Sequence, residues 1–465
     1  MGRTIIADEK IQTYAEKLQK EGTWFLGLII GKLTNQKDYA IHMVRTPEPV
    51  EDAASDDDDT EVLEQSEASS RKRRKSQTKP PSLEEMNEQW ASTHAKQVTM
   101  MLPGGLNVIG IFALAPETMM LKSQAKLRQI LFAIQKQDKK SQVPEMSNSF
   151  TDRILLQICS TTRKYTCKTI DVQDPKSTFR PADWKFQTLS ERWNCLETNI
   201  SLTVPVHIPE KSNTSSLTKQ IQTGLQPFCK QLWTSLVQID GSLRDKTELL
   251  DQSSDKKVKG KDKTQKTQQI FMCNILTPPS EPCSLSAPVI ETCSTSLTMR
   301  GTIHGRAYVT SKSTVEEAQQ TLQRDVIRSV LSRSELLCDD LQMIEEDTEK
   351  LEVYTTPRRV FFKLPGTSIQ LSDYMFTDEK PIEVKGRVQE LLDICIDEED
   401  LDLTTERPPT EEDCARLQDE EHTENGVPEN SSESNKGLTY YLIAGVGGAF
   451  AMVLAGISYM MAEES

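Results

Sequence analysis

Histidine is scarce in this sequence, and the few histidines lie far apart. Five occur among 465 residues, so no HExxH, HxH or zinc-finger spacing forms locally. The ten cysteines include no CxxC pair, a usage typical of reduced, mostly buried thiols in the cytosol. GxSxG, P-loop and GxGxxG sequences are also missing. These absences disfavour metalloenzymes, serine hydrolases and nucleotide-binding enzymes.

A net positive charge is also missing, because acidic residues outnumber basic ones. The net charge is −15, which argues against a surface that binds nucleic acid. The first residues, MGRTIIADEKIQTYAEK, include no apolar stretch of the kind found in a secretory signal. The sequence therefore favours a chain whose folded part stays in the cytosol.

Long apolar runs are missing except near the C-terminal end. Residues 438–462 include no charged side chain, and as a helix they would reach roughly 37 Å, against about 30 Å for the hydrocarbon core of a bilayer. We therefore expect a tail-anchored, single-pass protein with cytosolic N-terminal domains. Gly447, Ala451 and Ala455 repeat every four positions, which favours packing against another membrane helix. The alternative is that such small residues are simply common in membrane helices.

Composition divides the rest of the chain into folded and unfolded parts. Segments dominated by charge, serine and proline bury too little apolar surface to fold. The predicted organisation is a folded domain at 1–250 with a disordered charged insertion at 48–82, a linker at 251–269, a second domain at 270–397, an acidic flexible stalk at 398–436 and the anchor at 438–462.

Strand-like and helix-like segments alternate in both folded regions, which indicates an α/β fold. In the first region we expect a helix at 5–21 and a buried strand at 24–33, with Gly27 and Gly31 at its turns. Residues 217–250 are expected to be largely helical.

The second region shows the same alternation of strand-like and helix-like segments. A helix is expected at 314–341, opened by the cap-like STVEE, and a hairpin around Pro365 and Gly366. The order of strand, long helix and hairpin occurs at 108–172 and again at 306–376. An ancient duplication and common α/β architecture explain this likeness equally well.

Several motifs carry a family resemblance. The segment DPKSTFRPADWKFQ at 174–187, together with MGRTIIADE, WFLGLIIGKLTNQKDYAIHMVRTP and HAKQVTMMLPGGLNVIGIF, closely resembles the odorant-response-abnormal protein 4 family. The resemblance also covers the C-terminal apolar run. It implies an endoplasmic-reticulum membrane protein that assists folding and delivery of seven-helix G-protein-coupled receptors, including odorant receptors. It also implies a partner, the ubiquitin-fold-modifier-specific protease 2.

A second resemblance concerns the strands GLIIG and LNVIGIFALA, which look like the core of MPN (JAB-like) domains. It implies an MPN-like α/β sandwich at 1–250. Active members cut isopeptide bonds with zinc held by a His-x-His, but the matching positions here are Ala113, Leu114 and Ala115. Alanine offers zinc no lone pair, so no bound water would be activated. We therefore expect a pseudo-enzyme without metal or cofactor, in which His94 makes a surface or core contact.

Covalent catalysis by cysteine is an alternative chemistry. Cys159, Cys167 and Cys195 lie on or near predicted strands. A cysteine nucleophile needs a histidine base brought close by the fold. Because free cysteine is so often buried, structural roles are favoured for all three.

The best candidate surface for a partner is DPKSTFRPADW, which includes Phe179, Arg180 and Trp184. Arginine and tryptophan are enriched among residues that dominate interfaces. The alternative is a structured loop whose Trp184 fills the core of its own domain.

Two functions from different classes follow from these patterns. The first is a non-catalytic adaptor on the membrane, which concentrates a cytosolic partner by tethering and needs no active site. The second is a membrane-anchored isopeptidase or hydrolase. The missing His-x-His favours the adaptor, whereas stoichiometric zinc in the purified protein would favour the enzyme.

Overall fold

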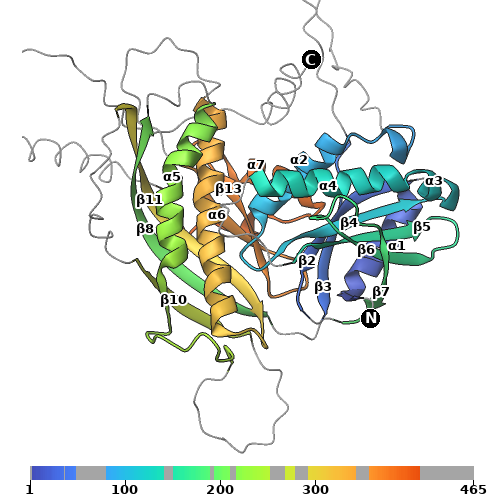
Figure 1. Cartoon of the computed structure of the whole chain (residues 1–465), viewed down its shortest axis with the longest axis horizontal. Helices are drawn as coiled ribbons and strands as arrows, with labels where there is room; N and C mark the ends of the chain where they lie inside the picture. Colours follow the sequence, from blue (N-terminus) through green and yellow to red (C-terminus); the bar gives the residue numbers. More distant parts are fainter. Residues whose placement is uncertain are drawn as a thin grey trace, which may run out of the picture.

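The structure, a computed structural model, describes residues 3–22, 24–35, 37–48, 80–140, 150–188, 193–209, 216–251, 268–277, 292–341 and 356–408. These residues form two lobes, one built on a β-barrel and one on a four-stranded sheet (Figure 1). Within these segments, no helix combines the length and the apolar character needed to cross a membrane. The predicted anchor at 438–462, with Gly447, Ala451 and Ala455, lies outside the described residues, as do most of the charged insertion and of the linker.

Seven strands close the barrel of the first lobe, in the order β1-β3-β2-β4-β5-β6-β7. β1 pairs in parallel with both β3 and β7, which joins the two ends of the sheet. β4 and β5 also run parallel, and the chain crosses between them through α3 and α4. The elements are β1 (Thr4–Ala7), α1 (Glu9–Glu21), β2 (Phe25–Lys32), β3 (Asp38–Arg45), η1 (Leu83–Glu85), α2 (Glu88–Met101), β4 (Asn107–Ala115), α3 (Glu117–Lys122), α4 (Gln124–Lys140), β5 (Asp152–Cys159), β6 (Tyr165–Asp171) and β7 (Arg180–Phe186).

The first element differs from the helix predicted at 5–21. Residues Thr4–Ala7 form β1, and α1 begins only at Glu9. The Asp8 side chain accepts a hydrogen bond from the Lys10 amide at 2.9 Å and so caps the helix. The helix prediction is therefore wrong for the residues before Asp8, because pairing with β3 and β7 decides their conformation.

Both faces of β4 are buried. Ile109 and Phe112 pack with the apolar side chains of α1, whereas Val108 and Ile111 pack with those of α2 and α4. Because helices cover both faces of β4, its sequence is a continuous apolar run and does not alternate between apolar and polar residues.

Gly27 and Gly31 lie inside β2 and not at its turns, which corrects the prediction. A Cβ atom on Gly27 would lie 2.1 Å from the Val44 carbonyl oxygen, and one on Gly31 would lie 1.9 Å from that of Tyr39. Glycine is therefore required because β2 and β3 approach too closely for any side chain.

The second lobe is a sheet of order β11-β8-β10-β9, covered on one face by two helices (Figure 1). Its two longest strands pair antiparallel from Trp193 to Pro209. The elements are β8 (Trp193–Pro209), α5 (Leu217–Thr234), β9 (Leu236–Ile239), β10 (Ile270–Leu276), β11 (Cys293–Thr310) and α6 (Val315–Leu341).

Two sequence expectations change in this lobe. The segment at 217–250 is helical only as far as Thr234, where α5 ends, and the chain then forms β9 and a series of turns. The boundary predicted near residue 250 falls inside the sheet, because β8 and β9 precede it whereas β10 and β11 follow it. The local composition does not indicate this pairing, because the paired strands are far apart in the sequence.

A smaller sheet completes the fold. β12 (Arg358–Lys363) and β13 (Gln370–Met375) form the predicted hairpin, with Gly366 at a φ of 69°. β14 (Leu401–Asp402) pairs with β12, and α7 (Pro381–Leu392) packs into the same core as α2 and the barrel. η4 (Glu398–Asp400), β14 and the residues up to 408 belong to this fold. The flexible stalk predicted from 398 is therefore wrong for 398–408, since Leu401 and Asp402 pair with β12 and the Glu406 side chain is buried.

Candidate functional site

The positions that correspond to His-x-His in MPN enzymes lie in the centre of the barrel lobe. Ala113, Leu114 and Ala115 are fully buried on β4, and the two alanines pack in the core shared with α2 and α4. No three or more His, Cys, Asp or Glu side chains gather as a metal site within the described residues. The MPN likeness of this lobe stays a prediction.

His94 makes a core contact, as the sequence indicated. Its Nε2 lies 2.9 Å from the Leu391 carbonyl oxygen, and His42 Nε2 lies 3.0 Å from that of Leu392. Burial lowers the pKa of His94 to about 4, so the ring is neutral and donates from Nε2. Both histidines therefore cap the last carbonyl groups of α7.

The three cysteines considered for catalysis fall into two groups. Cys167 and Cys195 are buried, and burial raises the pKa of each thiol to about 12. Cys159 lies at the end of β5, where hydrogen bonds from Thr162 lower the thiol pKa. A buried, protonated thiol is a poor nucleophile, so structural roles fit Cys167 and Cys195.

The motif at 174–187 supplies the strand that closes the barrel. Trp184 on β7 is half-buried against the core around α1, which agrees with the alternative that it fills its own domain. Phe179 packs against the neighbouring core, with Lys168 Nζ 6.0 Å from its ring centre. Arg180 remains exposed and pairs with Asp152 at 2.6 Å. The role of Phe179, Arg180 and Trp184 in binding a partner stays a prediction.

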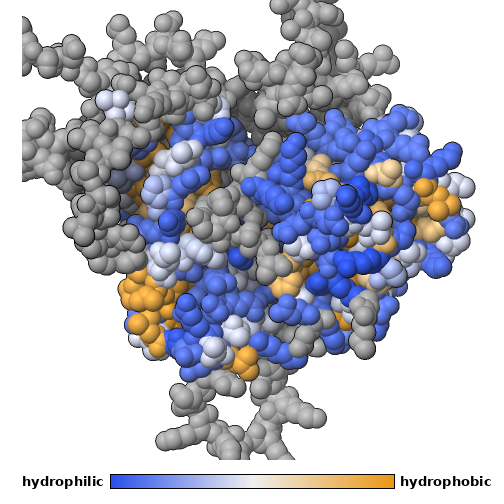
Figure 2. Space-filling view, viewed as in Figure 1, coloured by the Kyte–Doolittle hydropathy of each residue, from blue (hydrophilic) through white to orange (hydrophobic). Residues whose placement is uncertain are grey.

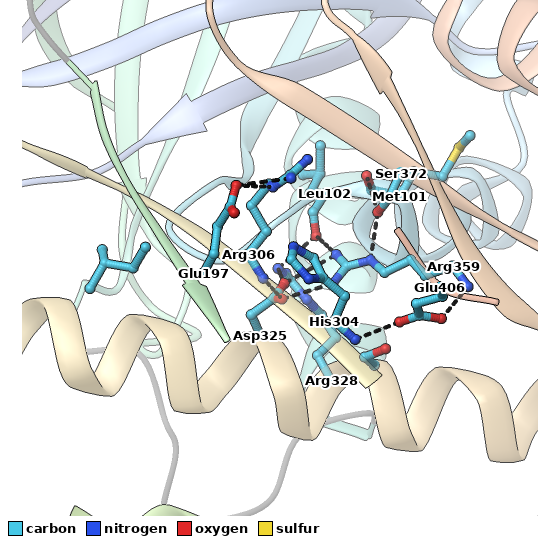
Figure 3. Close-up of polar contacts among 12 residues, drawn as sticks. Met101, Leu102, Glu197, His304, Arg306, Asp325, Arg328, Arg359, Ser372 and Glu406 are labelled. Atoms are coloured by element: carbon cyan, nitrogen blue, oxygen red, sulfur yellow. Dashed lines mark hydrogen bonds and ion pairs between the residues drawn. The ribbon is translucent and has the colours of Figure 1, made fainter. Parts of the chain in front are cut away.

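A buried ionic network lies where the two lobes meet (Figure 3). Asp325 of α6 binds Arg359 of β12 through two hydrogen bonds of 2.7 and 3.1 Å. It also accepts a hydrogen bond from the backbone amide of Arg306 at 2.8 Å. Arg359 donates to Ser372 Oγ at 2.8 Å, and that hydroxyl donates to the Met101 carbonyl oxygen of the barrel lobe. The network thus connects α6, the four-stranded sheet, the three-stranded sheet and the end of α2.

Glu406 occupies the other end of this network. Its carboxylate accepts two hydrogen bonds from Arg333, at 2.6 and 2.7 Å, and one each from the backbone amides of His304 and Arg359. Glu406 and Arg333 are 2% and 3% exposed, so each needs the other to offset its burial. Sequence reasoning missed this network, although the apolar neighbours of Asp325 on α6 were an available signal.

An apolar strip on the outer face of the second sheet was also missed. Leu236, Ile270, Met272 and Leu276 are 57%, 58%, 52% and 46% exposed. Leu276 lies opposite Leu236 in the β9–β10 pairing, and Figure 2 shows apolar side chains gathered over β10 at the lower left. We call these four residues the β10 strip.

The sequence of β10, IFMCNIL, is apolar in both phases of its alternation. Phe271 and Cys273 point into the core, whereas Ile270 and Met272 point outward. β9, next to β10, is the edge of its sheet. Apolar residues on an exposed face beside the edge strand of a sheet are characteristic of a surface that binds another protein.

Comparisons with known proteins identify the family. The family model described as ODR4-like, Odorant response abnormal 4-like, matches residues 27–403. The human Protein odr-4 homolog is 33% identical over 415 residues, which cover 87% of this chain and 86% of that protein. Odorant response abnormal protein 4 of Caenorhabditis elegans is 22% identical over 339 residues, which cover 71% and 68%.

Among solved structures, that of UfSP from Caenorhabditis elegans matches with a TM-score of 0.39 and 9% identity, over 84% of this chain and 57% of that one. A likeness at that level supports no inference about fold or function. The family match, by contrast, extends over most of the described residues. It confirms the resemblance found in the sequence motifs: the chain belongs to the Odorant response abnormal 4-like family.

Proposed function

We propose that this chain is a non-catalytic adaptor anchored in the endoplasmic-reticulum membrane. It recruits a cytosolic partner, the ubiquitin-fold-modifier-specific protease 2, and supports folding and trafficking of G-protein-coupled receptors, including odorant receptors. The relatives' names, which refer to the odorant response, support the receptor part of this proposal. The observation that carries the adaptor part is the β10 strip.

The β10 strip suits a protein partner for a physical reason. Burying a large apolar side chain contributes about 1.5–3 kcal/mol relative to leaving it exposed, and the β10 strip contains four partly exposed side chains of this kind. Part of this free energy is offset by the entropy lost on association. Tethering on a membrane raises the local concentration of a bound partner without any further contact.

Co-purification from detergent-solubilised membranes tests the proposal. The full-length chain should capture the protease in stoichiometric amounts, and Met272→Asp should reduce capture at least tenfold by placing a charge in the β10 strip. Leu121→Asp is the matched control, because Leu121 is 68% exposed on α3 of the other lobe. It should leave capture unchanged.

Two results would contradict the proposal. Equal capture by wild type and Met272→Asp would remove the β10 strip from the interface. Loss of capture by Arg180→Ala with retention by Met272→Asp would place the interface at the start of β7 instead.

A further inference from the structure

A cavity of about 90 Å³ lies between the two lobes. A single water needs about 10–15 Å³ of such space, so a small polyatomic ion fits inside. Helices of both lobes contribute to the cavity wall, together with the barrel strands β4 and β5. The polar lining residues that matter here are Lys96, Gln135, Arg153, Gln222, Arg324 and Arg328.

The cavity wall is positively charged. Lys96, Arg153, Arg324 and Arg328 line it, against two carboxylates, those of Asp138 and Glu335. Both carboxylates already have cations, since Lys96 pairs with Glu335 and Arg153 lies 3.9 Å from Asp138.

The remaining two arginines lack a dedicated carboxylate in the wall. Arg328 donates a hydrogen bond to the Leu102 carbonyl oxygen at 2.8 Å and lies 3.7 Å from Asp325, but that carboxylate holds Arg359 at 2.7 Å. Arg324 lies over the Trp233 ring, with 5.6 Å from its guanidinium carbon to the ring centre. Burial lowers the pKa of both arginines, and repulsion from Arg328 lowers that of Arg324 further, whereas the nearby Asp138 carboxylate, which Arg153 also approaches, partly opposes the shift in both. A bound anion would offset this excess charge.

Two buried polar atoms in the same wall also lack partners. Arg324 Nε and Gln135 Oε1 have no hydrogen-bond partner among the described residues. The first is a donor and the second is an acceptor. Because a buried polar group without a partner destabilises the fold, a ligand that both accepts and donates hydrogen bonds would be stabilised here.

We propose that this cavity binds a small tetrahedral oxyanion, namely a phosphate group. Phosphate supplies several acceptor oxygens for Arg324 and Arg328. Near neutral pH a phosphate also retains a proton in part, which it can donate to Gln135 Oε1. The group could come from inorganic phosphate or from a small phosphate ester such as a lipid headgroup fragment. Bound between α4 and α6, it would link the barrel lobe to the sheet lobe.

Isothermal titration of the full-length protein in detergent, at constant ionic strength in chloride buffer, tests the site. Inorganic phosphate should bind saturably with one site per chain and should raise the Tm. Glycerol 3-phosphate, titrated separately, distinguishes the sources: tighter binding than inorganic phosphate indicates an ester ligand, and weaker binding indicates the free ion. Sulfate, which has no proton to donate at neutral pH, should bind several times more weakly.

Three variants locate the binding. Arg324→Gln should weaken phosphate binding at least tenfold. Gln222→Glu adds a negative charge at the wall without removing packing, so it should weaken phosphate binding several times. This variant tests the site on its own if Arg324→Gln fails to fold. Arg180→Gln removes an arginine on β7, outside the cavity wall, and should leave the affinity within twofold of wild type.

Three results would overturn the proposal. One is no saturable phosphate binding by the wild type, and another is equal affinity in wild type and Gln222→Glu. Equal binding of sulfate and phosphate would overturn the pairing with Gln135 and hence the choice of phosphate.

Discussion

At the scale of single residues, the carboxylate of Glu406 accepts four hydrogen bonds, from one arginine side chain and two backbone amides. In the described residues it is the last side chain along the chain to join the buried network. Breaking a buried ion pair leaves an uncompensated charge in the protein interior, which costs more than the pair itself contributes. Glu406 is therefore more important for stability than its position within the predicted stalk at 398–436 indicates.

Glu406→Gln should lower the free energy of unfolding by about 3–5 kcal/mol, because Arg333 then stays buried without a carboxylate. Denaturant titration of the full-length protein measures the effect. Glu248→Gln is the control: Glu248 pairs with Arg244 at the surface and is 48% exposed, so its loss should change stability by less than about 1 kcal/mol. Equal effects would contradict the assigned importance of the network.

His94 gives a prediction about pH. Burial lowers its pKa from 6.5 to about 4, so between these values the unfolded chain binds a proton that the folded chain excludes. Its contribution to stability is therefore complete above about pH 6.5 and is lost as the pH falls toward 4. His94→Gln should make the fall in Tm between pH 7 and 5 shallower. His207→Gln, at an exposed position of β8, should keep the wild-type slope, and an unchanged slope in His94→Gln would contradict the prediction.

At the scale of elements, β2 shows what a close approach between strands requires. Gly31→Ala places a Cβ atom 1.9 Å from the Tyr39 carbonyl oxygen, which no side-chain rotation relieves. We expect the free energy of unfolding to fall by at least the amount typical of overpacking, which is about 1–3 kcal/mol. Gly22→Ala is the matched control, because its Cβ would meet only the movable Phe25 ring at 3.0 Å. Denaturation midpoints compare the two, and equal midpoints would show that β3 adjusts freely.

The sequence predicted the elements whose signals are local. α6 begins as expected after Thr314, whose hydroxyl accepts a hydrogen bond from the Glu317 amide at 3.2 Å, and it is helical through Leu341, the last described residue of its segment. The hairpin at Gly366 was predicted because glycine favours a positive φ. Periodicity and capping sufficed for both, since each depends on neighbours within a few positions.

Features set by distant partners were not predictable in the same way. β1 and β9 have four residues each, too few for a periodic pattern, and they are strands because longer strands pair with them. The buried network joins residues from 101 to 406, so no local window contains it. The β10 strip was hidden because a strand that is apolar on both faces resembles one that is buried on both.

At the scale of the whole molecule, the proposed orientation in the membrane has a direct test. Asn199, Asn213 and Asn430 each begin an N-glycosylation acceptor sequence, and Asn199 lies at an exposed position of β8. If the folded lobes face the cytosol, all three stay bare, so an N-glycan-removing glycosidase should leave gel mobility unchanged. A luminal glycoprotein in the same membranes serves as the positive control, and a downward shift of this chain would place the lobes in the lumen.

The position of Glu406 also sets the order in which the molecule is completed during synthesis. Arg333 emerges from the ribosome before its carboxylate partner Glu406 does, so the nascent chain carries this cation without its counterion until almost all of the described fold has been made. Incomplete folds expose apolar surface and aggregate. A fragment ending at 400 should therefore aggregate in cells, whereas one ending at 408 should stay monodisperse by size-exclusion chromatography; equal behaviour would show that the lobes mature without this last contact.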